Sequence, residues 1–161
     1  FVEFYGDGLD SLPLADRDGW LVGLQAQARC PYSEALVPAI VAKNHPLLRD
    51  VIPAYRAQIA KALQRSDLVS VNHRVAALLA SYFDVLFALN REAHPGEKRL
   101  VAYAYDHCEA LPEYFEKDVA GVLQASATGA GLLRHIDRLA DGLDALLQVN
   151  GYDPRTSRPY C

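Results

Sequence analysis

The chain has 161 residues, a formal net charge of −4 and 51% hydrophobic residues. This length suits one ordinary domain, and the composition excludes a disordered or collagen-like protein. Nucleic-acid binding requires clustered Lys and Arg that acids do not offset, so the acidic balance disfavours a DNA or RNA partner. No segment reaches the roughly 18 to 20 consecutive apolar residues of a membrane span.

The cysteines Cys30, Cys108 and Cys161 are odd in number and lie far apart in the sequence. They show neither a CxxC pair nor the Cys/His spacing of a zinc site. We therefore expect reduced thiols in a cytoplasmic protein, with no metal held by this chain.

The N-terminal stretch "FVEFYGDGLDSLPL" combines a strand-like start with turn residues. A lone strand cannot satisfy its own backbone groups, so it needs a partner sheet. We expect residues 1–15 to be a short strand and linker left from an upstream α/β domain. The absence of Met from the sequence supports the same expectation of a longer protein.

Helical periodicity then dominates the chain. It predicts an all-α bundle of about six or seven helices over residues 16–151, preceded by the short strand and followed by a tail at 152–161. The expected helices cover 18–29, 31–44, 46–66, 67–93, 97–109, 112–126 and 132–150.

Two of these helices carry most of the expected core. The one at 46–66 is predicted to bury a single stripe at i, i+3, i+4, i+7 spacing, made of Leu48, Val51, Ile52, Tyr55, Ile59, Ala62 and Leu63. The one at 67–93 has a wider apolar surface and a capping signal at Asp67, which predicts a central helix touched on several sides.

Three polar residues interrupt this central helix. Arg74, Ser81 and Asp84 are spaced by seven and then three residues, which predicts that they share one face. A buried carboxylate needs a partner. Asp84 is therefore expected either to pair with Arg74 or Lys98 or to line a ligand cleft.

The stretch "NREAHPGEKR" at 90–99 follows the central helix. Pro and Gly at its middle are expected to end that helix, with Lys98 and Arg99 at the start of the next. Positive charge is unfavourable at a helix start unless an anion is nearby. That anion is expected to be Asp84, Glu92 or a bound phosphate.

Several of these motifs together resemble the C-terminal part of nucleotidyltransferase-like proteins of the DNA polymerase beta superfamily, in particular bacterial proteins related to aminoglycoside nucleotidyltransferases. The likeness spans roughly residues 1 to 125. Its Asp-x-x-Gly-x-Leu turn is matched by Asp16, Gly19 and Leu21, and its helix–joint–helix pattern is similar to "FALNREAHPGEKRL".

The resemblance implies that this chain is the substrate-binding helical domain of an enzyme that moves a nucleoside monophosphate from an NTP to an acceptor. Mg²⁺ and NTP are expected for the full-length enzyme, with the Gly-Ser turn and metal-binding carboxylates in an upstream catalytic domain. None of those motifs occurs in this sequence, so no catalytic residue is assigned. The expected contacts for substrate are Arg74, Ser81, Asp84, Asn90 and His94, and those for phosphate are Lys98 and Arg99.

The alternative is a free-standing helical protein-interaction module with no catalysis. In that case the polar stretch at 90–99 is only a corner between two helices. A homodimer is a further expectation, because the edge of "FVEFY" invites pairing with a second strand.

Overall fold

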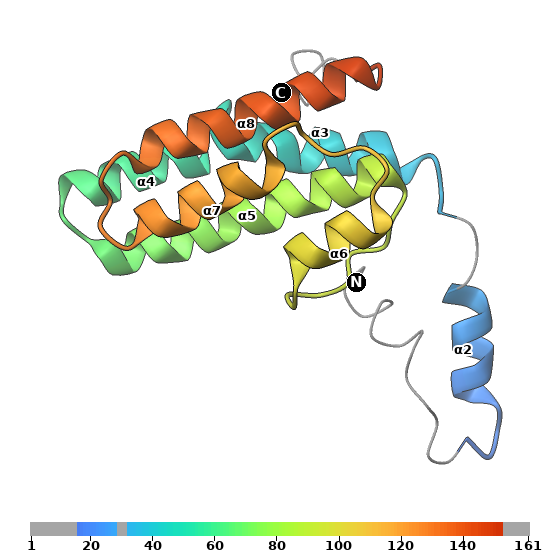
Figure 1. The fold of residues 1–161 in the computed structure, drawn as a ribbon. Helices are drawn as coiled ribbons and strands as arrows, with labels where there is room; N and C mark the ends of the chain where they lie inside the picture. The colour runs from blue at the N-terminus through green and yellow to red at the C-terminus, as the bar shows by residue number, and fades with distance from the viewer. Residues whose placement is uncertain (1–15, 29–31, 153–161) are drawn as a thin grey trace.

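The computed structural model describes residues 16–28 and 32–152 of the chain. In these ranges it contains seven α-helices and no β-strand (Figure 1). Their bounds are α2 Trp20–Ala28, α3 Leu36–Arg49, α4 Tyr55–Gln64, α5 Leu68–Asn90, α6 Leu100–His107, α7 Phe115–Ser126 and α8 Leu132–Val149. The all-α bundle is therefore confirmed, whereas the strand expected within residues 1–15 and nearly all of the tail lie outside the described residues. No helix among them is long and apolar enough to cross a membrane.

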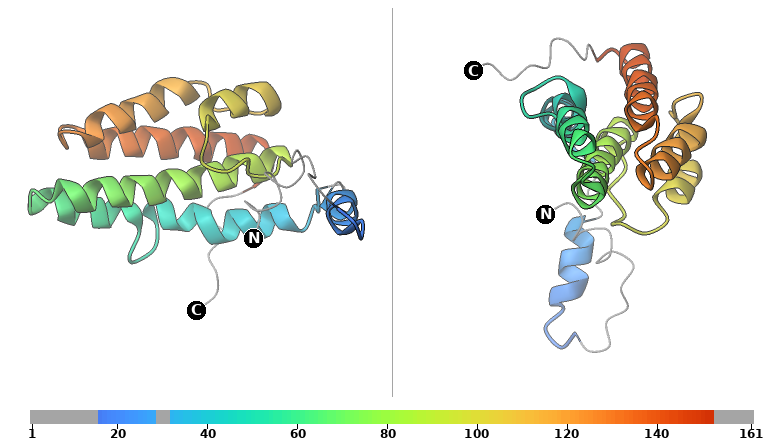
Figure 2. Two further views of the ribbon diagram at one scale, coloured as in Figure 1. Left: turned by 90° about the horizontal axis from the view of Figure 1, so that it is seen from below. Right: turned by 90° about the vertical axis from the view of Figure 1, so that its left-hand side faces the viewer.

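The bundle is organised around α5. Helices α3 and α4 lie nearly end to end along one side of α5, while α7 and α8 pack against each other and complete the bundle (Figures 1 and 2). At about 1.5 Å per residue, the 23 residues of α5 span about 34 Å. The long central helix predicted from the sequence thus sets the length of the molecule.

The second half of α5 is the most buried part of the fold. Its residues from Ser81 to Leu89 are all buried apart from the partly buried Asp84. Tyr82 and Phe83 contact each other edge to face, and both rings lie close to Phe115 of α7. Because other elements surround this stretch, an apolar surface wider than one stripe is what the position requires.

The helix expected at 46–66 is wrong in its bounds. Helix α3 continues through Pro46 to Arg49, and α4 begins only at Tyr55. Pro53 lies in the connection between the two helices, where proline disfavours helix at the preceding residue. Leu48 is buried on α3 and Ile59 on α4, but Ile52 is 99% exposed, so the predicted single stripe is divided between two helices.

The other prolines of this region are less disruptive than their positions in the sequence suggested. Pro38 is the third residue of α3, in the first turn, where the backbone N–H has no intrahelical partner. Pro46 does lie inside α3. Its carbonyl oxygen accepts hydrogen bonds from the backbone N–H groups of Asp50 and Val51, which close the end of the helix.

The two ends of α5 are set by different kinds of residue. Asp67 is its N-cap, as predicted, because the carboxylate accepts a hydrogen bond from the backbone N–H of Ser70 at 3.0 Å. The C-terminal end comes at Asn90, where Arg91 itself adopts the left-handed conformation at φ 60°. Gly96, expected to end the helix, has φ 89° but lies five residues further on, in the connection to α6.

Helix α8 is fastened to α3 and α4 by ion pairs. Its acidic residues Asp137, Asp141 and Asp144 follow a helical spacing beside the apolar stripe that enters the core. Arg56 binds Asp137 through two nitrogens at 2.5 and 2.7 Å. Arg49 reaches both other carboxylates, at 2.6 Å for Asp141 and 2.5 Å for Asp144.

Helix α2 stands apart from the other six helices in all three views (Figures 1 and 2). Its apolar residues are distributed around the helix rather than along one side, and Trp20 is 71% exposed. An all-round apolar helix normally packs against something else. Among the described residues, no side chain of α2 belongs to the hydrophobic core of the bundle.

Candidate functional site

The seven residues predicted for substrate and phosphate binding do not form one site. Arg74 lies near the start of α5, whereas Asn90 is its last residue. At about 1.5 Å per residue, these two positions are about 24 Å apart along the helix axis. His94, Lys98 and Arg99 follow Asn90 in the connection to α6, so these residues lie well away from Arg74.

Ser81 and Asp84 lie midway along α5. Ser81 is only 6% exposed and Asp84 is partly buried. Burial, and secondly the negative charge of Asp84, raise the pKa of Tyr32, which places this carboxylate beside the segment before α3. Arg74 lies ten residues before Asp84 on the same helix, about 15 Å along its axis, so the expected pairing of these two residues is wrong.

Asn90 connects the end of α5 to the segment before α7. Its side-chain amide donates hydrogen bonds to the carbonyl oxygens of Leu86 and Ala110, both at 2.9 Å. Its side-chain oxygen accepts a third from the N–H of Ala110 at 2.8 Å. Both ends of the amide are thus used inside the protein, which is the pattern of a residue that fixes a chain segment.

His94 is buried in the same joint, with 6% of its surface exposed. Its ring meets the ring of Phe87 edge to face, with 5.3 Å between centroids. Its Nδ1 accepts a hydrogen bond from the backbone N–H of Gly96 at 3.2 Å. The imidazole therefore holds the turn against α5.

Lys98 and Arg99 are exposed. Arg99 is the N-cap of α6 in a left-handed conformation at φ 55°, so α6 starts later than the predicted 97–109 helix. Within the described residues, neither cation forms an ion pair with Asp84 or Glu92. Because both side chains are in water, no neighbouring anion is required to balance them.

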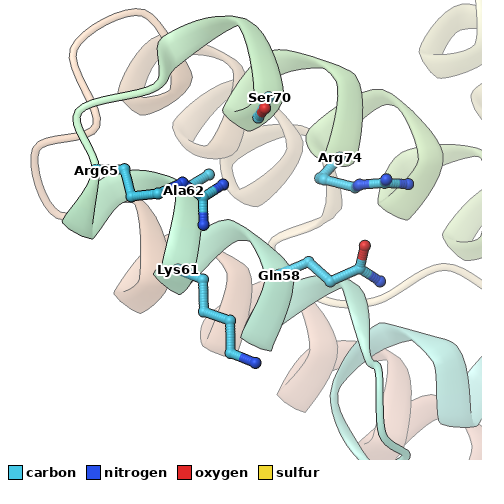
Figure 3. Close-up of a pocket in the computed structure, with 6 residues that line it drawn as sticks. All are labelled: Gln58, Lys61, Ala62, Arg65, Ser70 and Arg74. Carbon is cyan, nitrogen blue, oxygen red and sulfur yellow. The ribbon is translucent and has the colours of Figure 1, made fainter.

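The structure instead brings Arg74 into a pocket that the sequence did not reveal. This α4–α5 pocket is an open hollow of about 180 Å³ near the turn that joins the two helices (Figure 3). Its lining residues are Gln58, Lys61, Ala62, Arg65, Ser70 and Arg74. Three of the six side chains carry a positive charge, and none is a carboxylate.

Helical spacing creates this lining. Gln58, Lys61, Ala62 and Arg65 follow the i, i+3, i+4, i+7 pattern of one helix face. Ser70 and Arg74 are four apart on α5, and the tight turn through Ser66, at φ 56°, returns the chain alongside α4. In the sequence, the pocket was indicated only by the segment "YRAQIAKALQR", which has a basic face and no acidic residue. The residues of α5 that face it could not be predicted without the geometry of the turn.

The charges in the α4–α5 pocket are only partly neutralised. Arg65 lies 3.9 Å from the carboxylate of Asp67, at the rim of the pocket. Hydrogen bonds from the Ser70 side chain, and then from the Ser70 backbone, hold the pKa of Asp67 below its usual value. In the described part of the chain, Lys61 and Arg74 have no carboxylate within ion-pair distance.

The arrangement of side chains in Figure 3 distinguishes two flanks of the pocket. Gln58 and Arg74 extend to the same side of the helix pair, and Ser70 lies above them on α5. Lys61 points along the outer side of α4, so its flexible four-carbon stem must turn to bring the ammonium group to a ligand held by Arg74.

Residues 16–28 and 32–152 offer neither a group of metal ligands nor a reactive thiol. No group of three or more His, Cys, Asp or Glu side chains in these ranges is arranged to hold a metal ion. Burial, followed by the charge of Glu92, raises the pKa of Cys108 to about 11, so this thiol stays protonated and unreactive near neutral pH. The α4–α5 pocket, with its uncompensated cations, is suited to an anion.

Comparisons with models of known protein families, with curated proteins and with solved structures give no match to this chain. The case for a function therefore rests on the geometry of the α4–α5 pocket and on the motifs of the sequence.

Proposed function

We propose that this chain is the substrate-binding helical domain of a nucleotidyltransferase, and that the α4–α5 pocket holds a phosphate group of its ligand. The observation that carries the proposal is the lining of this pocket, with Lys61, Arg65 and Arg74 and no carboxylate among its residues. The motifs quoted from the sequence supply the reaction class, and the pocket supplies the chemistry by which a nucleotide or a phosphorylated acceptor is held.

The chemistry of the lining fits phosphate better than other small ligands. An Arg guanidinium presents parallel N–H donors that match two phosphate oxygens, and Lys adds a point charge. Arg74 is partly buried, which weakens its screening by solvent and strengthens its attraction for an anion. Ala62 at the base is small enough to leave the hollow open.

The transfer step itself requires groups that the described residues do not supply. Their side chains do not fit the Mg²⁺ that the resemblance implies, because no suitable group of metal ligands occurs among them. Under the proposal, the helical bundle binds and orients the phosphate-bearing ligand, and an upstream catalytic domain holds the metal for the reaction.

Nucleotide binding to the full-length protein tests the proposal. Arg74→Ala should weaken ATP binding by about tenfold or more, the loss typical of one charge-assisted contact. Lys43→Ala is the matched control, because Lys43 lies on α3 and away from the α4–α5 pocket. Circular dichroism and thermal unfolding of both variants show whether the bundle is intact.

Two results would contradict this function. Equal binding of ATP and of phosphorylated acceptors by the wild type and a well-folded Arg74→Ala variant removes the pocket from the mechanism. A full-length protein that transfers no nucleoside monophosphate to any acceptor in the presence of Mg²⁺ removes the reaction class.

A protein-interaction module is the second candidate, and helix α2 favours it. Trp20 is 71% exposed and Val22 is 56% exposed on a helix that lies away from the bundle. Exposed apolar surface of this kind marks sites of protein contact. Trp20 is the single Trp of the chain, so its fluorescence reports on this helix alone. A water-exposed emission that shifts to the blue when a partner binds would support the module.

A further inference from the structure

We infer that the α4–α5 pocket selects phosphate monoesters over phosphodiesters, so that its ligand ends in a terminal phosphate group. This inference rests on the proposed function and makes it more specific. The ligand class includes the terminal phosphate of an NTP and the phosphate of a phosphorylated acceptor. It excludes the diester backbone of nucleic acid.

Charge balance is the first argument. Lys61, Arg65 and Arg74 contribute three positive charges to the lining, and Asp67 at the rim offsets one of them through Arg65. Two positive charges remain. A phosphate monoester carries nearly two negative charges at neutral pH, because its second pKa is about 6. A diester carries one charge and would leave one pocket cation unbalanced.

Hydrogen bonding is the second argument. A monoester has three oxygens without a substituent, whereas a diester has two. Arg74 can donate two parallel N–H bonds, and the side chain of Gln58 extends to the same side of the pocket (Figure 3). The Gln58 amide already donates one hydrogen bond, to Pro53 at 2.8 Å, and keeps a second N–H. Arg74 and Gln58 together therefore offer three N–H donors on this side of the pocket, one for each unsubstituted oxygen of a monoester.

Size is the third argument. Sites for whole drug-sized molecules enclose about 300 to 1,000 Å³. The α4–α5 pocket has about 180 Å³ and is open to solvent. It takes the phosphate end of a ligand and leaves the remainder outside. A diester has a second substituent on the phosphorus, which takes the place of the third unsubstituted oxygen of a monoester.

The test uses the full chain and three small probes in titration calorimetry or competition with a fluorescent nucleotide. The probes are methyl phosphate, dimethyl phosphate and sulfate. We expect methyl phosphate to bind about tenfold more tightly than dimethyl phosphate at neutral pH, which is the effect of one additional charged contact. Sulfate, a dianion without a substituent, should compete with methyl phosphate.

The pH dependence separates the charge of the ligand from that of the protein. Between about pH 5 and about pH 7, methyl phosphate loses its second proton, so its affinity should rise several-fold to tenfold. Sulfate keeps its charge throughout this range. The charged groups in the lining are Lys61, Arg65 and Arg74, Asp67 lies beside Arg65, and His73 is the neighbour of Arg74 in the sequence. A change in the charge of the protein alters sulfate binding as well, so we expect the ratio of methyl phosphate affinity to sulfate affinity to rise with pH, and an unchanged ratio would overturn the inference.

Variants at the rim complete the test. Asp67→Asn keeps a good N-cap residue but removes the offsetting charge, so methyl phosphate, with nearly two charges, should gain more affinity than dimethyl phosphate and selectivity should rise several-fold. Asp106→Asn is the matched control. It removes the same charge at an exposed position of α6, far from α4. ATP and a sugar phosphate, measured in parallel, show which source of the monoester the protein prefers.

The possible failures differ. Dimethyl phosphate binding as tightly as methyl phosphate, through Arg74, overturns the monoester inference and leaves the anion pocket standing. Absence of binding by all three probes, or binding that Arg74→Ala does not change, overturns the monoester inference and the pocket's part in the proposed function together.

Discussion

The Nε2 atom of His45 lies 2.6 Å from Oδ1 of Asp144, a contact that joins α3 to α8 across 99 positions of the sequence. His45 is 2% exposed. The second oxygen of Asp144 accepts a hydrogen bond from Arg49 at 2.5 Å, so one carboxylate binds two side chains of α3. This contact holds α8 beside α3.

Replacing this carboxylate should cost far more than replacing its neighbour. Asp144→Ala leaves the buried His45 without its acceptor and Arg49 with Asp141 alone, and we expect about 2 to 3 kcal/mol less free energy of unfolding. Asp141→Ala is the matched control, because Asp141 is on the same helix and binds Arg49 from a position that is 66% exposed. The control should lose less than about 1 kcal/mol. Denaturant unfolding of both variants measures the difference, and equal losses would contradict it.

The ion pairs that join α8 to α3 and α4 predict a loss of stability in acid. Burial alone would raise the pKa of Asp144, but the hydrogen bonds from His45 and Arg49, together with their charges, lower it below its usual value. The hydrogen bond from Arg56 is the main reason that the pKa of Asp137 is lowered. A carboxylate with a lowered pKa stabilises the folded state fully above its unfolded pKa, near 3.9, and loses this effect as the pH falls through the folded value.

The melting temperature should therefore be nearly constant above about pH 5 and should fall steeply below about pH 4. Asp137→Asn should lower the melting temperature at neutral pH and make the fall in acid shallower. Asp106→Asn, at an exposed position of α6, should leave the shape of the curve unchanged. A variant at Asp137 with the wild-type acid profile would show that the Arg56 contact is not formed in solution.

A substitution at Asn90, in the joint after α5, distinguishes a structural role of this residue from a role in ligand binding. Asn90→Ala leaves the backbone N–H and carbonyl of the partly buried Ala110 without their partner, so we expect a loss of about 2 kcal/mol in unfolding free energy. Asn72→Ala is the control, because Asn72 bonds only the carbonyl of Leu68 one turn earlier on an exposed face. It should be within about 0.5 kcal/mol of the wild type. A stable Asn90→Ala protein that binds ligand poorly would instead assign Asn90 to the substrate.

Two glycines inside helices should respond in opposite directions to alanine. A Cβ at Gly121 of α7 would lie 2.5 Å from Nδ1 of His135, so Gly121→Ala must displace that ring and should destabilise the protein. A Cβ at Gly142 of α8 would meet only ordinary contact, with Pro112 at 3.4 Å. Gly142→Ala should therefore be neutral or stabilising by up to about 1 kcal/mol, the helix preference of Ala over Gly. Thermal unfolding checks both.

The steric reason is tested by a second substitution. In a His135→Ala background, Gly121→Ala should no longer destabilise, because the ring that it meets is absent. Persistence of the full loss in that background would place the cause elsewhere than in the contact with His135.

The sequence alone determined the helical character of this protein and the identity of its central helix. Periodicity over 67–93 and the capping signal at Asp67 depend on neighbours three or four residues apart, which any helix of this sequence must share. Proline and glycine were less decisive. Pro46 lies within α3, because tertiary packing compensates for an unfavourable residue in a helix. Helix α5 ends with Arg91, rather than Gly96, as the left-handed residue after it.

Only the tertiary structure decided which polar residues meet. The spacing of Arg74, Ser81 and Asp84 correctly gave positions on α5, but it could not show that Arg74 lines a pocket with residues of α4, or that Asn90 binds Ala110. The basic face of α4 and the acidic row on α8 were visible in the sequence, whereas their partners were not. A helix fixes the direction of each side chain relative to its own axis, while the side chain that it faces is set by the turns and by the packing of all the helices together.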